Sequence, residues 1–257
     1  MKVFDFSANW ERFSDERLNV SRLTEARESL VKLLQRESLE GVSFLDVGCG
    51  SGLFSIAAYH LGAGRVVGID VNPGCVALSV TNCRLLAPNA PIQFRQVSAL
   101  DRTALDALGC FDIVYAWGVL HHTGAMWEAI DLTLQRVAPG GDLVVAIYNK
   151  HITSPIWNRI KWLYNQLPGW GRGVMAWGLA GVIYIAKFIV TRRNPLEKER
   201  GMDFWYDVVD WIGGYPYEYA TPEAVETFIN SRGFQLSHFV PAQVPTGCNE
   251  FVFKKFK

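Results

Sequence analysis

Apolar and polar positions along most of the chain follow two alternating patterns. Short runs rich in valine, isoleucine, leucine and phenylalanine are typical of buried strands, and they occupy residues 43–47, 65–70, 92–97, 111–115 and 142–147. Between several of these runs, apolar residues recur every three or four positions, as on one face of a helix. Alternation of buried strands with helices predicts a parallel sheet that is covered by helices on both faces.

The helical spacing predicts four helices in this half of the chain, at residues 23–35, 53–61, 73–86 and 126–137. Pro73 suits the first turn of its helix, where a missing N–H costs nothing. The helix from residue 126 is expected to include Val137 and to end at Pro139-Gly140-Gly141, because proline and glycine interrupt helices.

Regular patterning returns near the C-terminus. Thr221 followed by Pro222 predicts a helix start, with threonine as the cap and proline in the first turn, and this helix is expected to stop at Gly233. The runs 236–240 and 250–253 predict an antiparallel pair at the sheet edge. The fold class is therefore α/β, a doubly wound, Rossmann-like, mostly parallel seven-stranded sheet with an N-terminal helical segment.

A helical, aromatic-rich insertion after the fifth strand interrupts this order. Apolar residues at 152, 156, 160, 163 and 167 follow helical spacing, and a break at Pro168-Gly169 precedes a second apolar segment. The chain thus divides into an N-terminal helical lid segment (1–40), the core (41–148), the insertion or substrate lid (149–220) and the final helix and strands (221–257). The insertion's aromatic residues are Trp157, Trp162, Tyr164, Trp170, Trp177, Trp205, Tyr206, Trp211, Tyr215, Tyr217 and Tyr219.

The segment Val174 to Val190 is apolar almost throughout, with Lys187 as its only charge. Its length is at the lower limit for crossing a bilayer. A buried lid helix is the favoured interpretation. The alternatives are a peripheral membrane contact, in which Arg192 and Arg193 meet anionic headgroups, and a true span.

The remaining composition narrows the choice of partners. Formal net charge is zero, which argues against a broad electrostatic grip on nucleic acid. The five cysteines lack metal-ligand spacing, so we expect reduced thiols, no metal site and a cytoplasmic protein. No signal peptide is expected at the start of the chain. The N-terminal aromatic residues either cover a cleft or pack on the domain; they are Phe4, Phe6, Trp10 and Phe13.

A glycine-rich turn, Gly48-Cys49-Gly50-Ser51-Gly52, follows the first predicted strand. In open parallel sheets ligands bind beyond the carboxyl ends of the strands, and glycines let the backbone approach a ligand closely. Asp70 ends the second strand, where a carboxylate can accept hydrogen bonds from both ribose hydroxyls and rejects a phosphate. Asp46 can act near a positively charged end of the ligand, directly or through water. The alternative is a purely structural turn.

The run from Phe44 to Gly52, followed by Val67-Gly68-Ile69-Asp70, resembles the first two motifs of class I S-adenosylmethionine-dependent methyltransferases. The segments 111–114, 120–122 and 137–143 are similar to that family's fourth-strand motif and to its turn into the fifth strand. The resemblance covers roughly residues 40 to 150. It implies S-adenosyl-L-methionine as the cofactor and an acceptor that the motifs leave unspecified.

The resemblance also implies further cofactor contacts. Val71 follows the ribose acid, and the adenine segment after the third strand contains Ser98 and Ala99. Many relatives carry an acid where this chain has Ser98, so either Ser98 or Asp101 is the candidate for the adenine amine. Trp117 and Gly118 follow the fourth strand and are expected to line the methionine part, although Trp117 could instead be a core residue. The cofactor set is completed by the turn residues Gly48, Cys49, Gly50 and Gly52.

Methyl transfer to a hydroxyl needs a base or a shifted pKa in addition to alignment. His121 and His122, just beyond the fourth strand, and Tyr148, at the end of the fifth, are the catalytic candidates. Of the two histidines, His122 matches the family position better. The competing interpretation is that the histidines orient the loop. Lys150 could also contact the acceptor, and the expected substrate-binding residues are Asn149, Trp157, Tyr215 and Tyr217.

The placement of the insertion resembles the ubiquinone-pathway O-methyltransferases, although His121 replaces the acid that this subgroup carries before the histidine. We therefore expect transfer to a small-molecule acceptor, an oxygen of an aromatic or lipophilic metabolite, without nucleic acid as a partner. Nitrogen or carbon methylation, RNA methylation, a NAD-binding oxidoreductase and a non-catalytic nucleoside-binding subunit are the alternatives. The sequence leaves the oligomeric state open.

Overall fold

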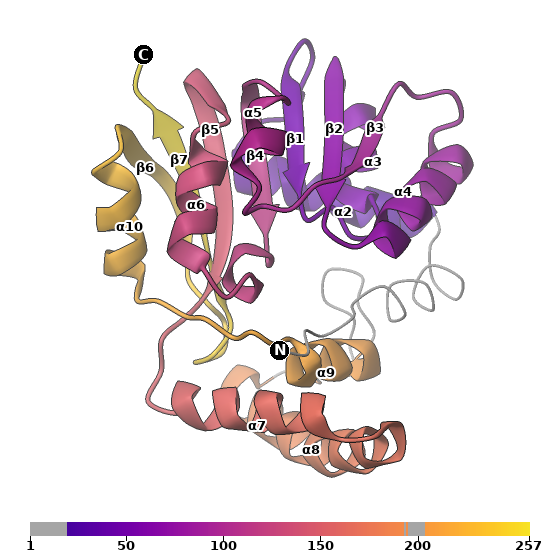
Figure 1. Cartoon of the computed structure of the whole chain (residues 1–257), viewed down its shortest axis with the longest axis vertical. Helices are drawn as coiled ribbons and strands as arrows, with labels where there is room; N and C mark the ends of the chain where they lie inside the picture. The colour runs from indigo at the N-terminus through magenta and orange to yellow at the C-terminus, as the bar shows by residue number, and fades with distance from the viewer. Residues whose placement is uncertain (1–19, 193, 195–203) are drawn as a thin grey trace.

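A single seven-stranded sheet organises the chain in the computed structural model, which describes residues 20–192, 194 and 204–257. The strand order is β3-β2-β1-β4-β5-β7-β6, and only β7 is antiparallel to its neighbours (Figure 1). This confirms the predicted fold class, including the antiparallel pair at the edge. The strands are β1 (Ser43–Val47), β2 (Arg65–Asp70), β3 (Gln93–Gln96), β4 (Phe111–Trp117), β5 (Val137–Tyr148), β6 (Phe234–Val240) and β7 (Cys248–Lys255).

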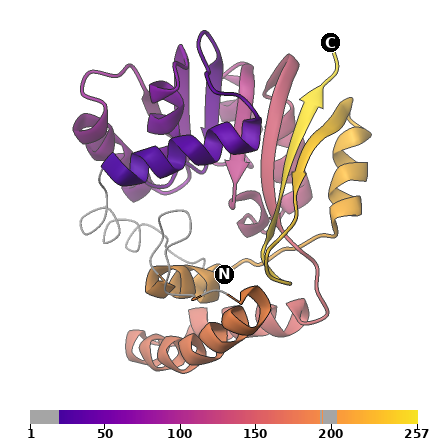
Figure 2. The ribbon, with the colours of Figure 1, turned by 180° about the vertical axis from the view of Figure 1, so that it is seen from behind.

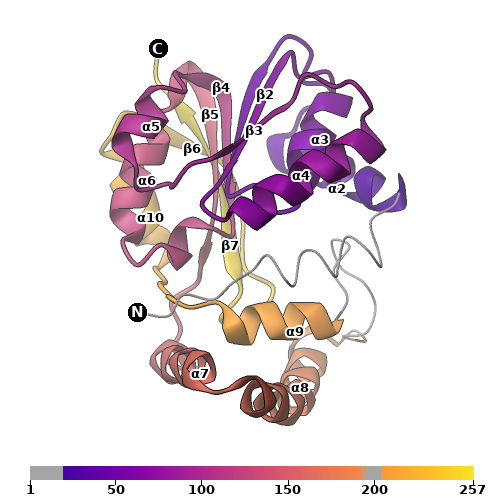
Figure 3. The ribbon, with the colours of Figure 1, turned by 45° about the vertical axis from the view of Figure 1, so that its right-hand side comes forward.

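Helices cover both faces of the sheet (Figure 3). One layer holds α2 (Val20–Leu34), α3 (Leu53–His60) and α4 (Pro73–Leu86). The other holds α5 (Arg102–Asp106), α6 (Met126–Leu134) and α10 (Pro222–Asn230). Strands β1, β2, β4 and β5 are therefore buried between the two layers, as their apolar runs predict, whereas the edge strand β3 is largely exposed.

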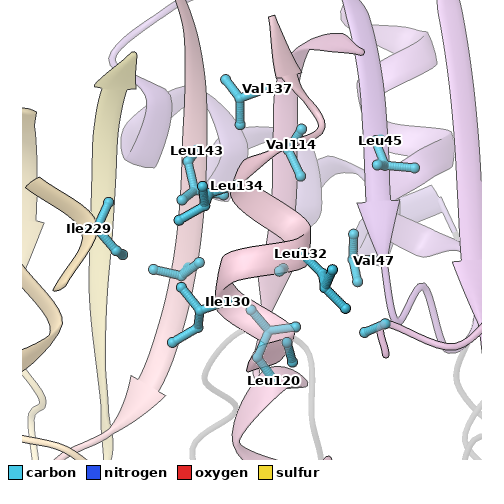
Figure 4. Close-up of a cluster of buried hydrophobic side chains, with 14 of the residues drawn as sticks. Leu45, Val47, Val114, Leu120, Ile130, Leu132, Leu134, Val137, Leu143 and Ile229 are labelled. Atoms are coloured by element: carbon cyan, nitrogen blue, oxygen red, sulfur yellow. The ribbon is translucent and has the colours of Figure 1, made fainter. Parts of the chain in front are cut away.

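The strands divide their side chains between the two layers with the period of two that a pleated strand imposes. Leu45 and Val47 pack with α6 and α10 in one cluster (Figure 4), whereas Phe44 packs with α2 and α3 in the other. All three side chains are at most 1% exposed. The short strand β1 is thus fixed from both sides, and the turn that follows it starts from a rigid position.

The end of α6 differs from the prediction. The helix stops at Leu134, and Val137 pairs with Phe111 as the first residue of β5. The pairing then shifts so that Asp142 lies opposite Ile113. Pro139-Gly140-Gly141 is therefore an irregularity within a strand rather than a helix stop; a Cβ on Gly141 would lie 2.7 Å from the Asp112 carbonyl oxygen. The helical period through Val137 was a coincidence of spacing.

The insertion forms its own helical layer beyond the carboxyl ends of the parallel strands (Figures 1 and 2). It contains α7 (Ser154–Gln166), α8 (Gly169–Thr191) and α9 (Phe204–Gly213). The apolar stripe predicted for α7 faces outward, since Ile156 and Leu163 are 57% and 46% exposed. The buried lid helix expected at 174–190 is buried on one face only, because Ala176 and Ala180 are buried whereas Val174 is 69% exposed.

The chain returns from the insertion to the core through residues 214–220, which we call the strap. The Ala220 N–H donates to the Tyr148 carbonyl at 3.0 Å, and the Lys150 N–H donates to the Ala220 carbonyl at 3.0 Å. Thr221 then caps α10, as predicted, by accepting from the Ala224 N–H at 3.3 Å. These bonds fix the chain just before residue 221 against the end of β5.

The structure bears on two further expectations, and a third lies outside the described residues. All five cysteines are free thiols. Among the described residues, no helix combines the length and apolarity needed to cross a bilayer. The aromatic segment with Phe4, Phe6, Trp10 and Phe13 lies outside the described residues.

Gly68 of β2 should resist replacement by alanine. Its position lies opposite Phe94 of β3, and an added Cβ would approach the Phe94 ring to 2.7 Å and the Ser55 hydroxyl to 2.9 Å. We expect Gly68→Ala to lower the free energy of unfolding by about 1–3 kcal/mol in a denaturant titration. Gly178→Ala is the control: open space surrounds that helical glycine, so the change should be neutral or stabilising, and an equal loss in both variants would contradict the steric account.

Candidate active site

The glycine-rich turn lies between β1 and α3, at the carboxyl edge of the sheet. The Gly48 and Cys49 N–H groups donate to the Ile69 carbonyl at 2.7 and 2.9 Å, so the turn is tied to the end of β2. Gly48, Gly50 and Gly52 have φ values of 73°, 54° and 75°. These left-handed angles favour glycine, which accounts for the spacing of the three glycines in the sequence.

Gly48 also permits a close approach of two loops. A Cβ on this residue would lie 2.3 Å from a methyl carbon of Val119, which follows β4. The turn after β1 and the loop after β4 therefore touch across the sheet edge. Gly48 is therefore required for the packing of these two loops at the edge where ligands bind in parallel sheets.

Side chains from α4 hold the turn from the other side. The Ser79 hydroxyl donates to the Gly50 carbonyl at 3.0 Å, and the Asn82 amide donates to the Ser51 carbonyl at 2.9 Å. The Cys49 thiol lies 3.6 Å from the Ser79 hydroxyl, and burial raises its pKa well above the usual value. Cys49 thus contributes to the site as a neutral, buried thiol.

Asp70 joins the turn to the end of β2. One carboxylate oxygen accepts from the Gly50 N–H at 3.0 Å and the other from the Asn72 N–H at 2.9 Å. Burial raises the pKa of this carboxyl, and the backbone hydrogen bonds oppose that shift. Each carboxylate oxygen retains further lone-pair capacity for a ribose hydroxyl. Val71, the next residue, is 65% exposed beside it.

Asp46 is the more deeply buried of the two acids, with 3% exposure. It accepts a hydrogen bond from the Ser55 hydroxyl at 2.7 Å. Burial, followed by a smaller contribution from the nearby Asp70 charge, raises the pKa of Asp46 to about 7. A nearby cation offsets both effects, so this carboxyl suits a ligand with a positively charged group.

The other predicted cofactor residues lie along the same edge. Ser98 and Ala99 follow β3, where the Ser98 hydroxyl accepts from the Leu100 N–H at 3.2 Å. Asp101 caps α5 by accepting from the Ala104 N–H at 3.0 Å. Trp117 ends β4 and packs against the α2–α3 cluster, and Gly118 follows it with a φ of 74°. Ser98 and Asp101 thus each already accept a backbone hydrogen bond, and either residue is still the candidate for the adenine amine.

A cluster of rings lies at the ends of β4 and β5. His121 and His122 form the short 3₁₀ helix η1 (Leu120–His122), and Tyr148 is the last residue of β5. The His121 and Tyr148 ring centroids are 4.1 Å apart, and those of His122 and Tyr148 are 5.5 Å apart. The structure thus brings the three catalytic candidates together.

The two histidines have different surroundings. His121 is fully buried, and burial lowers its pKa well below the usual value. Neither of its ring nitrogens meets hydrogen-bond geometry with a group in the described part of the chain, although the Ala146 backbone is close enough to favour protonation. This environment suits a neutral ring that fills space and orients its neighbours.

His122 has a defined tautomer. Its Nδ1 lies 2.7 Å from the Pro216 carbonyl oxygen, which can only accept, so Nδ1 carries the proton and Nε2 is the basic nitrogen of the neutral ring. Burial, and then the positive charge of Lys161, lower the pKa of His122 to about 3. The ring is therefore neutral across the physiological pH range.

The insertion contributes residues that the sequence did not identify. Lys161 of α7 is fully buried; its ammonium donates to the Trp211 carbonyl and lies 4.7 Å from the centroid of the Tyr217 ring. Glu218 accepts from the Met126 N–H at 3.1 Å, and its own N–H donates to the His121 carbonyl at 3.0 Å. No sequence motif identifies Lys161 or Glu218, because the folding of the insertion, and not the local sequence, brings them to the ring cluster.

The predicted substrate residues are partly dispersed. Tyr217 joins the ring cluster, with its centroid 5.0 Å from that of Tyr148. Trp157 packs against Trp211 at 4.3 Å within the insertion, and Tyr215 is half-buried at the start of the strap. The Asn149 side chain donates to the Pro245 carbonyl at 2.9 Å and accepts from Asn249 at 3.1 Å, so it links β5 to the turn between β6 and β7.

These features fit an adenosyl sulfonium. The turn is a glycine-rich backbone segment with left-handed angles at the sheet edge, Asp70 offers carboxylate oxygens at the ribose position, and Asp46 is a buried acid that a cation would stabilise. Within residues 20–192, 194 and 204–257, no group of histidine, cysteine and acidic residues could hold a metal ion. The site thus defines the class of S-adenosylmethionine-dependent methyltransferases.

Comparison with known proteins agrees with this class. The family described as "Methyltransferase domain" matches residues 18–234. The chain belongs to this family, and its cofactor is S-adenosylmethionine.

Two curated relatives each match less than half of the chain. The chain is 34% identical over 112 residues to the ubiquinone biosynthesis O-methyltransferase of Rhizobium rhizogenes, which covers 44% of this chain and 43% of that protein. It is 36% identical over 107 residues to the tRNA U34 carboxymethyltransferase of Shewanella halifaxensis, covering 42% and 32%. The chain thus matches less than half the length of these relatives.

A solved structure resembles nearly the whole chain. The magnesium protoporphyrin IX methyltransferase of Synechocystis PCC 6803, with bound SAH, superposes with a TM-score of 0.58 at 14% identity. The match covers 96% of this chain and 93% of that chain. This likeness establishes a shared fold.

The raised pKa of Asp46 leads to a test by pH. Ionisation of Asp46 between pH 6 and 8 should strengthen binding of S-adenosylhomocysteine, whose ammonium group is a cation, because the pKa of Asp46 is about 7. Calorimetric titrations of the wild type should show this rise. Asp46→Asn cannot ionise, so its affinity should be about tenfold weaker at pH 8 and nearly independent of pH. Equal pH dependence in both proteins would contradict the assignment.

Ionisation of Asp46, which should strengthen ligand binding, should lower the stability of the ligand-free protein. Its folded pKa of about 7 lies above the ordinary value of 3.8, so the ligand-free protein should lose stability as pH rises through this interval. Because Asp46→Asn has no carboxyl to ionise at this position, its melting temperature should not show the fall with rising pH that Asp46 causes in the wild type.

Proposed function

We propose that this methyltransferase transfers the methyl group to an oxygen of a small aromatic or lipophilic acceptor. The ring cluster at the ends of β4 and β5 supports the proposal, because it combines a neutral imidazole with flat aromatic side chains. His122 supplies the imidazole, and Tyr148 and Tyr217 lie beside it. Aromatic rings bind flat, apolar ligands well, and one nearby polar group can fix their orientation.

Bound S-adenosylmethionine supplies a methyl group on a sulfonium, which is an effective leaving group. The chain's own task is then to align the acceptor and exclude water, and alignment alone can lower such a barrier by about 7–11 kcal/mol. The insertion layer beyond the strand ends carries out the exclusion of water, and the ring cluster aligns the acceptor.

His122 is the candidate for handling the acceptor proton. With Nδ1 bound to the Pro216 carbonyl, Nε2 accepts a hydrogen bond from an acceptor hydroxyl. The low pKa makes Nε2 a weak base, so its main effect is to orient the hydroxyl while the oxygen attacks; the proton that the hydroxyl loses passes through Nε2 to solvent. The positive charge of Lys161, which helps to lower the pKa of His122, also stabilises negative charge that develops on an adjacent oxygen.

A macromolecular acceptor is the second candidate. One relative is named for tRNA, and another, from Geobacter metallireducens, is a ribosomal protein L11 methyltransferase with 38% identity over 102 residues, covering 40% of this chain and 31% of that protein. The zero net charge of the chain argues against an RNA acceptor, because nucleic-acid-binding domains are usually basic.

Turnover with labelled donor separates the candidates. The purified protein is incubated with a small-molecule extract, with total RNA or with ribosomes, and label is followed into each fraction. Label in an organic-extractable compound that is stable to nuclease and protease supports the proposal. Label confined to RNA or to a ribosomal protein would replace it with the second candidate.

Two variants of His122 test its role once an acceptor is known. In His122→Asn the amide N–H can still donate to the Pro216 carbonyl, whereas the nitrogen at Nε2 is lost. We expect kcat to fall about 10²-fold in this variant, because the acceptor hydroxyl loses the group that orients it, with unchanged affinity for S-adenosylhomocysteine. His122→Gln, the matched control, places a polar group nearer Nε2 and should lose less activity. Wild-type kcat in His122→Asn would remove His122 from the reaction.

A further inference from the structure

The outer face of α8 carries an exposed apolar stripe. Trp170, Val174, Trp177 and Ile185 are 78%, 69%, 72% and 59% exposed, and their spacing of three, four or eight residues places them on one side of the helix. Val182 and Ile189, at 57% and 58%, widen the stripe. Single exposed apolar residues are common, but a continuous stripe on one helix marks an interaction surface.

The opposite face of α8 is already used inside the protein. Ala176 and Ala180 are buried in a cluster with Tyr164 of α7 and with Val208 and Ile212 of α9. Most of the exposed stripe therefore points away from α9; Trp177, at its edge, packs against Trp205 of α9 with the ring centroids 4.8 Å apart. Since α9 lies between α8 and the sheet (Figure 3), the stripe faces away from the core.

The outward side of α7 extends this apolar surface. Ile152, Ile156 and Leu163 are 88%, 57% and 46% exposed, whereas Lys161 and Asn165, on the other side of the helix, bond to backbone carbonyls of α9. Both helices thus present apolar side chains on the side that faces away from α9. We call this combined surface, formed by the residues of α7 and α8 just named, the outer apolar face.

Charge is segregated around this face. The chain as a whole is neutral, yet residues 143–196 contain seven lysine and arginine residues and no aspartate or glutamate. Arg159 lies exposed on the outward side of α7, and Arg192 is exposed at the end of α8. An apolar face flanked by exposed basic residues is the pattern of helices that lie in a membrane interface.

We propose that the outer apolar face docks the protein on an anionic lipid surface. The apolar side chains would enter the boundary between headgroups and acyl chains, and the basic residues would meet lipid phosphates. A second copy of the chain is a poorer occupant, because the basic residues that flank the face in the two copies would repel each other. A bound nucleic acid would explain the basic residues. It would, however, place its phosphates next to exposed valine and isoleucine side chains, which would gain no apolar contact.

In the docked state α8 lies on the lipid surface and does not cross it. Its inner face is packed against α7 and α9, so lipid cannot surround it. Because the insertion layer lies beyond the carboxyl ends of the strands (Figure 1), docking would hold the site edge of the sheet toward the membrane. The docking proposal stands on these helices alone and does not depend on the identity of the acceptor.

Vesicle sedimentation tests the proposal with the full chain. Vesicles of phosphatidylcholine alone are compared with vesicles that contain phosphatidylglycerol, each at low and high salt. We expect binding to the anionic vesicles, weakened by salt. The variant Trp170→Ser/Val174→Ser/Ile185→Ser should bind at least about tenfold more weakly, because it removes apolar area from the interface.

Two matched variants complete the design. Leu85→Ser/Phe256→Ser removes exposed apolar side chains elsewhere, with 70% and 58% exposure, and should bind vesicles like the wild type. Arg159→Gln/Arg192→Gln should lose the preference for phosphatidylglycerol. Unchanged affinity of the triple variant for S-adenosylhomocysteine shows that it is folded.

The outcomes are decisive in both directions. Loss of vesicle binding in the triple variant alone, with binding kept in Leu85→Ser/Phe256→Ser, supports docking through this face. Absence of wild-type binding to anionic vesicles overturns the proposal, as does equal binding by the triple variant. A wild-type dimer that the triple variant dissociates, without vesicle binding, would assign the face to a second copy instead, and RNA binding without vesicle binding would assign it to nucleic acid.

Discussion

The carboxylate of Asp70 is the constraint on which the site depends. Its two oxygens accept from the N–H groups of Gly50 and Asn72, so a single side chain fixes the glycine turn after β1 against the end of β2. A buried carboxylate is costly unless hydrogen bonds compensate it, and the backbone N–H groups here oppose the rise in its pKa that burial causes. Loss of this link would leave the turn held by the Ile69 carbonyl and the side chains of α4.

The second half of the site is assembled across the insertion. The strap that returns from α9 binds His122 through the Pro216 carbonyl and His121 through the Glu218 N–H. The same Glu218 carboxylate accepts from the first N–H of α6. Acceptor-side residues are therefore positioned by a segment almost a hundred residues further along the chain, which couples the insertion to the reacting edge.

Much of the core follows from local sequence. The strands at 43–47 and 65–70 and the helix at 73–86 were predicted with the observed bounds, because buried strands and a proline-started helix have strong local signals. The errors arose where tertiary context decides. Val137 has helical spacing but pairs with Phe111, α7 turns its apolar stripe outward because Lys161 is held inside, and the short helix α5 was missed. Lys161 and Glu218 carry no motif, so only the fold reveals them.

Calorimetric titration of the purified chain with S-adenosylhomocysteine tests the central claim most directly. The account predicts binding by the wild type, no binding of NAD, and at least about tenfold weaker binding by Asp70→Ala. Asp112→Ala, which removes an acid bonded to Ser43 at the opposite end of β1, should bind like the wild type. A wild type without affinity for S-adenosylhomocysteine, or an Asp70→Ala variant with full affinity, would contradict the account.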